Sequence, residues 1–327
     1  MKDAAPPQVL AYSVEHLDAS GVVRQFRLNS FSDGTLELVD SRHRMFLKRV
    51  YCPHITRDAL YEGSVVNVFG RAFEILGPAD PGTTKYVERT STAAAAVRLD
   101  SQALGEMVRR LERAVTAIRS LATVRLVDLP ADAHERLKEV PGNLVVSICV
   151  YDATTAAGAK LDDALRDIVS VPLDPTLDLH TLAHCCDPLT LCLVKPHVLK
   201  AKRGGDLLLA IARAGFEVAA LHLFFLDATS AHAFFTAYKG VWREYEDIVA
   251  HCTQGPCLAL MLQADPAPFR DFCGPLDVEL AKALRPTSLR ATFGDTLVEN
   301  AVHCTDMSED GQLECHFFFN LLAKAGA

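Results

Sequence analysis

Three features are missing from this sequence, and each absence narrows the classes of function. No run of about twenty apolar residues and no N-terminal signal peptide is present, so we expect neither a membrane span nor secretion. None of the ten cysteines form a Cys-x-x-Cys pair, which argues against a bound metal and favours buried thiols in a reducing cytoplasm. An excess of positive charge is also missing, because 33 Lys and Arg face 41 Asp and Glu. The resulting net charge of −8 argues against nucleic-acid or anionic-membrane partners.

Apolar residues, in contrast, are abundant. They make up 50% of the 327 residues, enough for the cores of two or three globular domains. The first part of the chain favours short strands, because apolar and polar residues alternate there and Asp33-Gly34 is a hairpin signal. We predict a small all-β domain over residues 9–82, followed by a short linker at 81–92. Its expected strands are 9–14, 22–28, 36–38, 45–50 and 65–76.

From residue 92 the pattern changes to strands that alternate with helices. We predict strands at 93–97, 115–127 and 143–150, with helices at 103–114, 131–140 and 160–169. The same order returns after residue 188, which indicates an internal repeat: a shortened copy at 92–176 and a full copy at 188–325. The first copy carries no cluster of candidate catalytic residues. Arg98 lies where the second copy has Lys195.

The second copy contains a histidine with chemically suitable neighbours. His303 follows Arg290 by thirteen residues and Asn300 by three, while Thr305 and Glu314 come two and eleven residues later. A neutral imidazole is a nucleophile near neutral pH, and a phosphoryl group that it accepts needs cations around its oxygens. A carboxylate or hydroxyl can hold the ring in one tautomer. The alternative is that His303 is a half-buried polar residue of a loop.

The segment Asn300-Ala301-Val302-His303-Cys304-Thr305-Asp306 resembles the nucleoside diphosphate kinase signature Asn-x-x-His-x-Ser/Thr-Asp. In that family the histidine takes the terminal phosphate of a nucleoside triphosphate and passes it to a diphosphate. The resemblance implies ferredoxin-like α/β domains, with Mg²⁺ and ATP or GTP as cofactors if the chain is active and with none otherwise. It implies catalytic roles for His303, Glu314 and Thr305 and nucleotide or phosphate contacts for Lys195, Arg270, Arg290 and Asn300.

The N-terminal region resembles the DM-ten domain of ciliary doublet-microtubule proteins. The resemblance rests on Phe26-x-Leu28-x-x-Phe31-x-Asp33-Gly34-Thr35-x-Glu37-x-x-Asp40, Arg44-x-Phe46-Leu47-Lys48-Arg49 and Gly63-x-Val65-x-Asn67-Val68. It implies a PH-like β domain and hence an α+β chain. It also implies a structural role inside the doublet microtubule of the cilium or flagellum, with tubulin and other inner proteins as partners and a location in the cytoplasm, cytoskeleton and axoneme.

Several positions depart from the kinase pattern. By our alignment Phe235 replaces a tyrosine, Glu244 a base-stacking phenylalanine, Leu276 a threonine that touches phosphate, Glu299 an arginine and Cys304 a glycine. These changes remove favourable contacts with nucleotide and add negative charge. Three functions remain open: a structural microtubule inner protein, an active kinase that works through phospho-His303, and a sensor that binds nucleotide without turnover.

Overall fold

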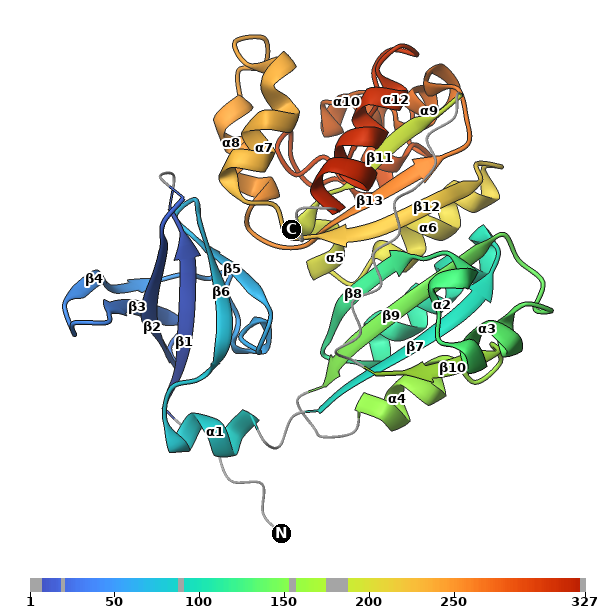
Figure 1. Cartoon of the computed structure of the whole chain (residues 1–327). Coiled ribbons are helices and arrows are strands. Elements are labelled where there is room, and N and C mark those ends of the chain that lie inside the picture. Colours follow the sequence, from blue (N-terminus) through green and yellow to red (C-terminus); the bar gives the residue numbers. More distant parts are fainter. Residues whose placement is uncertain (1–7, 19–20, 88–90, 153–156, 175–187, 324–327) are drawn as a thin grey trace. The chain divides into compact units, whose positions relative to one another are not determined.

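The computed structural model describes residues 8–18, 21–87, 91–152, 157–174 and 188–323 (Figure 1). The chain divides into two compact units. The first comprises Met1–Ser91 and Asp152–Ala157, and the second comprises Thr92–Tyr151 and Gly158–Ala327. The two copies of the repeat therefore belong to one unit.

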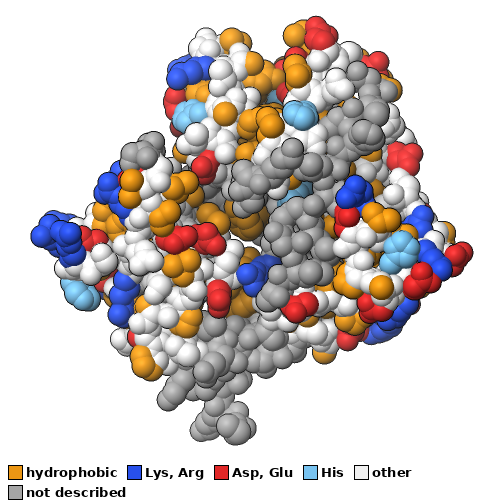
Figure 2. All heavy atoms as spheres, in the orientation of Figure 1, with side chains coloured by type: hydrophobic (Ala, Val, Ile, Leu, Met, Phe, Trp, Pro, Cys, Tyr) orange, Lys and Arg blue, Asp and Glu red, His pale blue; other side chains and the backbone are white. Residues whose placement is uncertain are grey.

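The first unit is built on an antiparallel sheet with the strand order β4-β3-β2-β1-β6-β5. Alternating apolar residues of these strands bury one face, where Tyr12, Leu28 and Phe73 are almost inaccessible to solvent. Basic side chains gather beyond the ends of β3 and β4, at the far left of Figure 2. The strands are β1 (Val9–Leu17), β2 (Val23–Phe31), β3 (Thr35–Asp40), β4 (Met45–Tyr51), β5 (Val65–Val68) and β6 (Arg71–Pro78).

Two details of this unit differ from the expectation. The strand expected at 65–76 is divided into β5 and β6 by a tight turn, in which Phe69 and Gly70 both have a positive φ (51° and 78°), the geometry that two-residue hairpins favour. Part of the expected linker is helix α1 (Pro81–Val87). It begins there because the Asp80 carboxylate accepts a hydrogen bond from the Thr83 amide at 2.8 Å and Pro81 suits the first helical position.

The first copy of the repeat folds in the order β-α-β-α-β-α-β, which is the ferredoxin-like β-α-β-β-α-β arrangement with one added helix between its second and third strands. Its expected strand at 115–127 ends early, because Leu126–Asp128 form a 3₁₀ turn in which Arg125 pairs with Asp128 at 2.9 Å. The elements are β7 (Ser91–Leu99), α2 (Ser101–Ala114), β8 (Ala117–Thr123), α3 (Ala131–Leu137), β9 (Leu144–Asp152), α4 (Ala157–Ala164) and β10 (Ser170–Leu173).

The second copy repeats this order with additional helices. Its core includes the fully buried rings of Phe224, Phe235 and Phe318. The elements are β11 (Thr190–Val194), α5 (Pro196–Lys200), α6 (Gly204–Arg213), β12 (Val218–Phe224), α7 (Ala228–Phe235), α8 (Tyr245–Cys252), β13 (Cys257–Leu262), α9 (Pro266–Cys273), α10 (Val278–Leu284), α11 (Leu289–Phe293), β14 (Val302–Cys304) and α12 (Gly311–His316), which continues as a wider helix over Phe317–Leu322.

One continuous sheet joins the two copies. Its order is β10-β7-β9-β8-β12-β13-β11-β14, so that the second strands of both copies are neighbours at the centre. His222 pairs with Ala122 across this junction, and the Leu221 amide donates to the Thr123 hydroxyl at 2.9 Å. The expected fold class is confirmed: an N-terminal β unit followed by ferredoxin-like α/β structure. The shared sheet adds that the two copies form a single body.

Helices α2 and α6 pack together closely across the same junction. A Cβ atom at Gly205 would lie 2.2 Å from the backbone nitrogen of Arg109, so this position requires glycine. The Glu112 carboxylate, from α2, accepts hydrogen bonds from the Gly204 and Gly205 amides at 2.9 and 3.0 Å and thereby caps α6. Burial raises the pKa of Glu112 to about 6, although these hydrogen bonds oppose the shift.

The part of the chain that the structure describes contains eight cysteines, all buried and none in a disulfide bond, while Cys185 and Cys186 lie outside it. Within the same residues, no group of His, Cys, Asp and Glu side chains has the arrangement of a metal site. No helix found there combines the length and apolarity needed to cross a bilayer.

Candidate functional site

His303 is held by strand β14 and by a strained turn that precedes it. The strand pairs with β11, where His303 lies opposite Leu193. Ala301 has φ 68°, and the Val302 amide donates to the Asn300 carbonyl oxygen at 2.9 Å across it, which makes a γ-turn of the strained, positive-φ kind. Such a residue costs on the order of 1–3 kcal/mol, which the surrounding structure must offset. The turn directs the ring of His303 into the body of the second copy, where it is 4% exposed.

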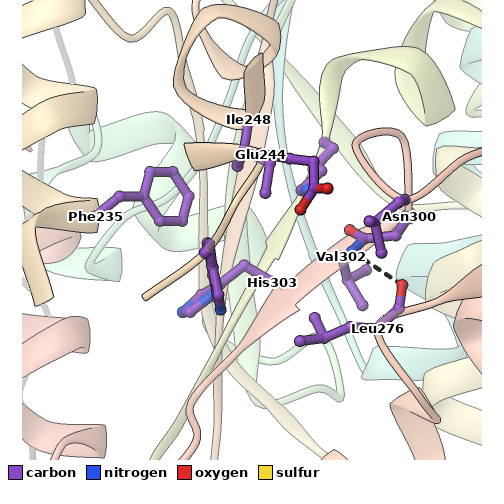
Figure 3. Close-up of a pocket in the computed structure, with 10 residues that line it drawn as sticks. Phe235, Glu244, Ile248, Leu276, Asn300, Val302 and His303 are labelled. Carbon is purple, nitrogen blue, oxygen red and sulfur yellow. Dashed lines mark hydrogen bonds between the residues drawn. The ribbon is translucent and has the colours of Figure 1, made fainter. Parts of the chain in front are cut away.

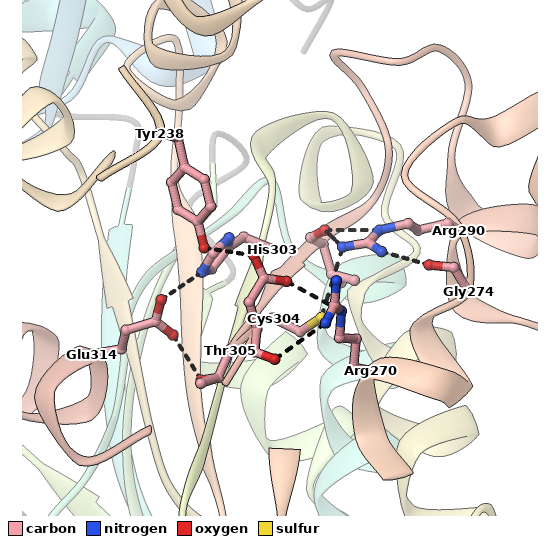
Figure 4. A network of polar contacts seen from close by, with 10 residues as sticks. Tyr238, Arg270, Gly274, Arg290, His303, Cys304, Thr305 and Glu314 are labelled. Atoms are coloured by element: carbon pink, nitrogen blue, oxygen red, sulfur yellow. Dashed lines mark hydrogen bonds and ion pairs between the residues drawn. The ribbon is translucent and has the colours of Figure 1, made fainter. Parts of the chain in front are cut away.

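A carboxylate and a hydroxyl fix the orientation of the His303 ring (Figure 4). Nε2 of His303 lies 3.1 Å from Glu314 Oε1, and the Thr305 hydroxyl donates to Glu314 Oε2 at 2.7 Å. The carboxylate selects the tautomer with its proton on Nε2 and leaves the lone pair of Nδ1 for chemistry. Burial disfavours the charged imidazolium, but the charge of Glu314 and its hydrogen bond outweigh this effect and raise the pKa of His303.

Aromatic side chains enclose the ring, and two of them, Phe234 and Tyr238, were missed by the sequence analysis. The rings of Phe234, Phe235 and Tyr238 make T-shaped contacts with His303, with centroids 5.1, 5.6 and 5.8 Å from that of the imidazole. The hydroxyl of Tyr238, which is labelled beside His303 in Figure 4, donates to Asp306 Oδ2 at 2.9 Å. Tyr238 lies 65 residues before His303 in sequence (303 − 238), and no local motif singles it out.

A small pocket opens beside His303 (Figure 3). Its volume is about 80 Å³, whereas pockets that hold a small-molecule ligand usually span roughly 300–1,000 Å³. The lining is mostly apolar and consists of Lys195, Phe235, Trp242, Glu244, Ile248, Leu276, Leu297, Asn300, Val302 and His303. The space is too small for a nucleotide in this conformation of the chain.

The polar side chains of this lining are poorly placed to bind an anion. Some already donate to backbone carbonyl oxygens, and one carries a negative charge itself. The Lys195 ammonium donates to the Val298 carbonyl oxygen at 2.8 Å, and burial lowers the pKa of Lys195 to about 8. Asn300 donates through Nδ2 to the Leu276 carbonyl oxygen at 3.3 Å, while its buried Oδ1 has no partner in the described structure. Glu244 presents a carboxylate to the same space, as Figure 3 shows. A phosphate would therefore meet one cation and one opposing negative charge.

Arg290 does not line the pocket. It is 4% exposed, and its guanidinium donates to the carbonyl oxygens of Gly274, at 2.5 Å, and Val302, at 3.2 and 3.4 Å (Figure 4). These bonds hold the backbone at Gly274 and at Val302, the first residue of β14. Arg290 also lies 3.7 Å from the Cys304 sulfur, and the pKa of that thiol is lowered to about 6, first by a hydrogen bond from Cys273 and then by the charge of Arg290.

Arg270 is also directed elsewhere. Its Nε lies 3.3 Å from Asp306 Oδ1 and its Nη1 donates to the Asp306 carbonyl oxygen at 3.3 Å. Glu299, at the position of a family arginine, lies 3.8 Å from Nδ1 of His251. That histidine shares a 3.0 Å hydrogen bond with His197, and burial lowers the pKa of both rings, to about 3 and about 4.

The candidate residues of the second copy thus form two groups in space. Lys195, Asn300 and His303 meet at the pocket, with Glu314 and Thr305 on the other side of the ring. Arg270 and Arg290 stabilise nearby backbone and acidic groups instead. In the first copy, Arg98 donates to the carbonyl oxygens of Gly142 and Lys138 at 2.9 and 2.7 Å, a structural use of the position that corresponds to Lys195.

Comparison with known proteins relates this site to one family. The family model described as nucleoside diphosphate kinase matches residues 189–323. The chain is 30% identical to nucleoside diphosphate kinase homolog 7 of Mus musculus and of Rattus norvegicus, in each case over 95% of this chain and 93% of the relative. A crystal structure of the Aquifex aeolicus nucleoside diphosphate kinase is 30% identical, covers 41% of this chain and 96% of its own, and has a TM-score of 0.39.

The similarity to the two rodent proteins extends over nearly the full length of both partners, the N-terminal β unit included. The chain therefore belongs to the nucleoside diphosphate kinase homolog 7 family.

Proposed function

We propose that this protein is a structural component of the ciliary or flagellar doublet microtubule, built on a nucleoside diphosphate kinase scaffold. The observation that carries the proposal is the pocket beside His303. It measures about 80 Å³, and no arginine is among the described residues that line it. Phosphoryl transfer depends on positioning and on cations around the transferred group, and both conditions are poorly met.

The N-terminal unit supports the location. Its sequence resembles the DM-ten domain of doublet-microtubule proteins, and its sheet exposes polar and basic side chains that a core does not need, among them Lys48 and Arg49. The proposed partners are tubulin and other inner proteins of the doublet. The second unit supports a structural role as well, because one continuous sheet joins its two copies.

The test uses the tagged full-length chain in ciliated cells. We expect it in the axoneme, retained on doublets after detergent and high-salt extraction, and we expect His303→Ala to be retained equally. A chain that lacks residues 9–82 should be released. Absence of the wild-type chain from axonemes, or its release together with soluble matrix proteins, would contradict the structural role.

A second function is favoured by the intact pair of His303 and Glu314. In an active kinase with bound ATP or GTP, Nδ1 of His303 would attack the terminal phosphorus, the nucleoside diphosphate would leave with the bridging oxygen, and a second diphosphate would take the phosphate from phospho-His303. Glu314 would hold the proton on Nε2 throughout. Mg²⁺ would accompany the nucleotide and neutralise part of its charge.

Incubation with ATP labelled at the terminal phosphate distinguishes the two functions. The structural proposal predicts acid-labile labelling of His303 at least 100-fold slower than that of the Aquifex aeolicus kinase, and no labelling of His303→Ala. Labelling at a rate similar to that of the bacterial enzyme would favour the kinase instead.

A further inference from the structure

The two edges of the N-terminal sheet differ in their accessibility. At one edge, β5 is short, and Val66, Asn67 and Val68 are buried. At the other edge, every residue of β4 is exposed or half-buried. A strand at a sheet edge has backbone N–H and C=O groups on its outer side that the sheet does not pair. The outer side of β4 is therefore available to an added strand.

The charge of this edge is opposite to that of the whole chain. Residues 41–51 contain four Lys and Arg and no Asp or Glu, although the net charge of the chain is −8. The side chains of Arg42, Arg44 and Lys48 are exposed, and within the described structure none makes an ion pair. Arg49 is different, because it pairs with Asp33 at 2.6 Å and lies over the Phe31 ring.

Apolar side chains are exposed between the basic ones. Met45 is 52% exposed, Phe46 41% and Tyr51 63%. Lysine and arginine on an edge strand commonly serve to prevent aggregation, but that purpose does not account for large apolar side chains left beside them. Backbone groups, apolar contacts and positive charge together suit an extended peptide rather than a folded surface.

We propose that β4 binds a short, extended, acidic segment of a partner protein, which adds to the sheet as a seventh strand. Main-chain hydrogen bonds would supply the affinity, and Arg42, Arg44 and Lys48 would select carboxylates. Two irregularities in the pairing of β3 with β4 shift the register at Leu36 and at Leu38, and such bulges limit regular pairing to a few residues. This favours a short segment.

The same observations exclude other occupants. A second copy of this chain would bring four basic residues against four, and like charges across an interface disfavour association. Nucleic acid and anionic membranes fit the charge but make no use of the strand's backbone groups. An acidic, extended segment would thus be one partner of the structural protein proposed above. That the two meet on the doublet rests on the proposed function, whereas binding in solution tests the β4 site separately.

The experiment measures binding of the full chain to a fluorescent octapeptide of alternating valine and glutamate, blocked at both ends. We expect binding that weakens as salt rises, a loss of at least tenfold in Arg42→Glu/Arg44→Glu/Lys48→Glu, and a smaller loss in Lys48→Glu alone. The same peptide with N-methylated valines should also bind at least tenfold more weakly, because it cannot form the ladder. Circular dichroism checks that each variant is folded.

A matched control reverses three exposed basic residues elsewhere, Arg113→Glu/Arg213→Glu/Lys239→Glu, and should bind the peptide as the wild type does. Undiminished binding of the N-methylated peptide, an equal loss in the control, or no binding by the wild type would each overturn the inference. Tighter binding of polyuridylate or of phosphatidylserine vesicles would assign the edge to nucleic acid or membrane instead. Failure of the wild-type chain to bind the peptide, together with its retention on doublets, would refute this inference and leave the structural proposal standing.

Discussion

Arg290 donates twice to the carbonyl oxygen of Val302, the residue before His303, at 3.2 and 3.4 Å. An arginine expected to hold phosphate therefore holds the strand that carries His303. A buried guanidinium with carbonyl partners is costly to remove, because its partners lose hydrogen bonds in a site that water does not reach.

The first prediction follows from this contact. Arg290→Ala should lower the free energy of unfolding by about 2–4 kcal/mol, as measured by urea denaturation. The control is Arg270→Ala. Because the ion pair of Arg270 with Asp306 is largely exposed, this change should lower the free energy of unfolding by less than about 1 kcal/mol. Equal, small losses in both variants would mean that Arg290 is free to serve a ligand.

The second prediction concerns the pKa of His303. It should exceed 6.5 in the wild type and fall below 6.5 in Glu314→Gln, because burial then acts without the opposing carboxylate. Nuclear magnetic resonance of the labelled imidazole measures both values. Similar pKa values in the two proteins would show that Glu314 does not control the ring.

The same pair makes stability depend on pH. The raised pKa of His303 gives stabilisation that is complete below 6.5 and is lost as pH rises through the folded-state value. The lowered pKa of Glu314 gives stabilisation that is present above 4.5 and is lost as pH falls through its folded-state value. The stability difference between the wild type and Glu314→Gln should therefore be largest between about pH 4.5 and 6.5. A stability difference that increased above pH 8 would contradict the predicted pH dependence.

The third prediction tests the junction between the copies. Gly205→Ala puts a methyl group 2.2 Å from the Arg109 backbone nitrogen and should lower the melting temperature of the second unit, at a cost of about 3 kcal/mol or more. Gly158→Ala, in helix α4, has open space at the same atom and should be neutral or stabilising by up to about 1 kcal/mol. Calorimetry on the full chain measures both. A tolerated Gly205→Ala would mean that α2 and α6 are not tightly packed.

The fourth prediction concerns Lys195. Burial lowers its pKa from 10.5 to about 8, so between these values the unfolded chain binds a proton that the folded chain does not. The contribution of Lys195 to stability should accordingly rise from pH 8 to pH 10 and disappear in Lys195→Met. The measurement is the wild-type minus variant difference in unfolding free energy at each pH. A flat difference would indicate an ordinary, solvated ammonium.

Local pattern was sufficient for much of the fold. Alternation and helical periodicity predicted the order of strands and helices in the first copy as far as α4, and the return of that order in the second copy, because they report which face of each element is buried. They missed β10, the last strand of the first copy. They could not predict the pairing of β8 with β12, since periodicity identifies a strand without naming its neighbour. The division of the strand expected at 65–76 was missed because Phe69, a bulky residue with positive φ, gives no turn signal.

The site divides in the same way. The spacing around His303 selected Glu314 and Thr305. Glu314 contacts the ring and Thr305 contacts Glu314, while their catalytic roles stay predictions. The direction of the Arg290 guanidinium depends on the Gly274 carbonyl, sixteen residues away (290 − 274) in another loop, which no spacing rule encodes. Tyr238 and its bond to Asp306 also arise from tertiary packing alone.

The central position of β8 and β12 has a consequence for synthesis on the ribosome. Strand β8 ends at Thr123 and its partner begins at Val218, about 95 residues later (218 − 123). At roughly 5–20 residues per second, the edge of β8 remains unpaired for about 5–20 s after it is made. The nascent first copy is therefore exposed to strand exchange with other chains during this interval, and a chaperone that covers β8 would protect it until its own β12 arrives.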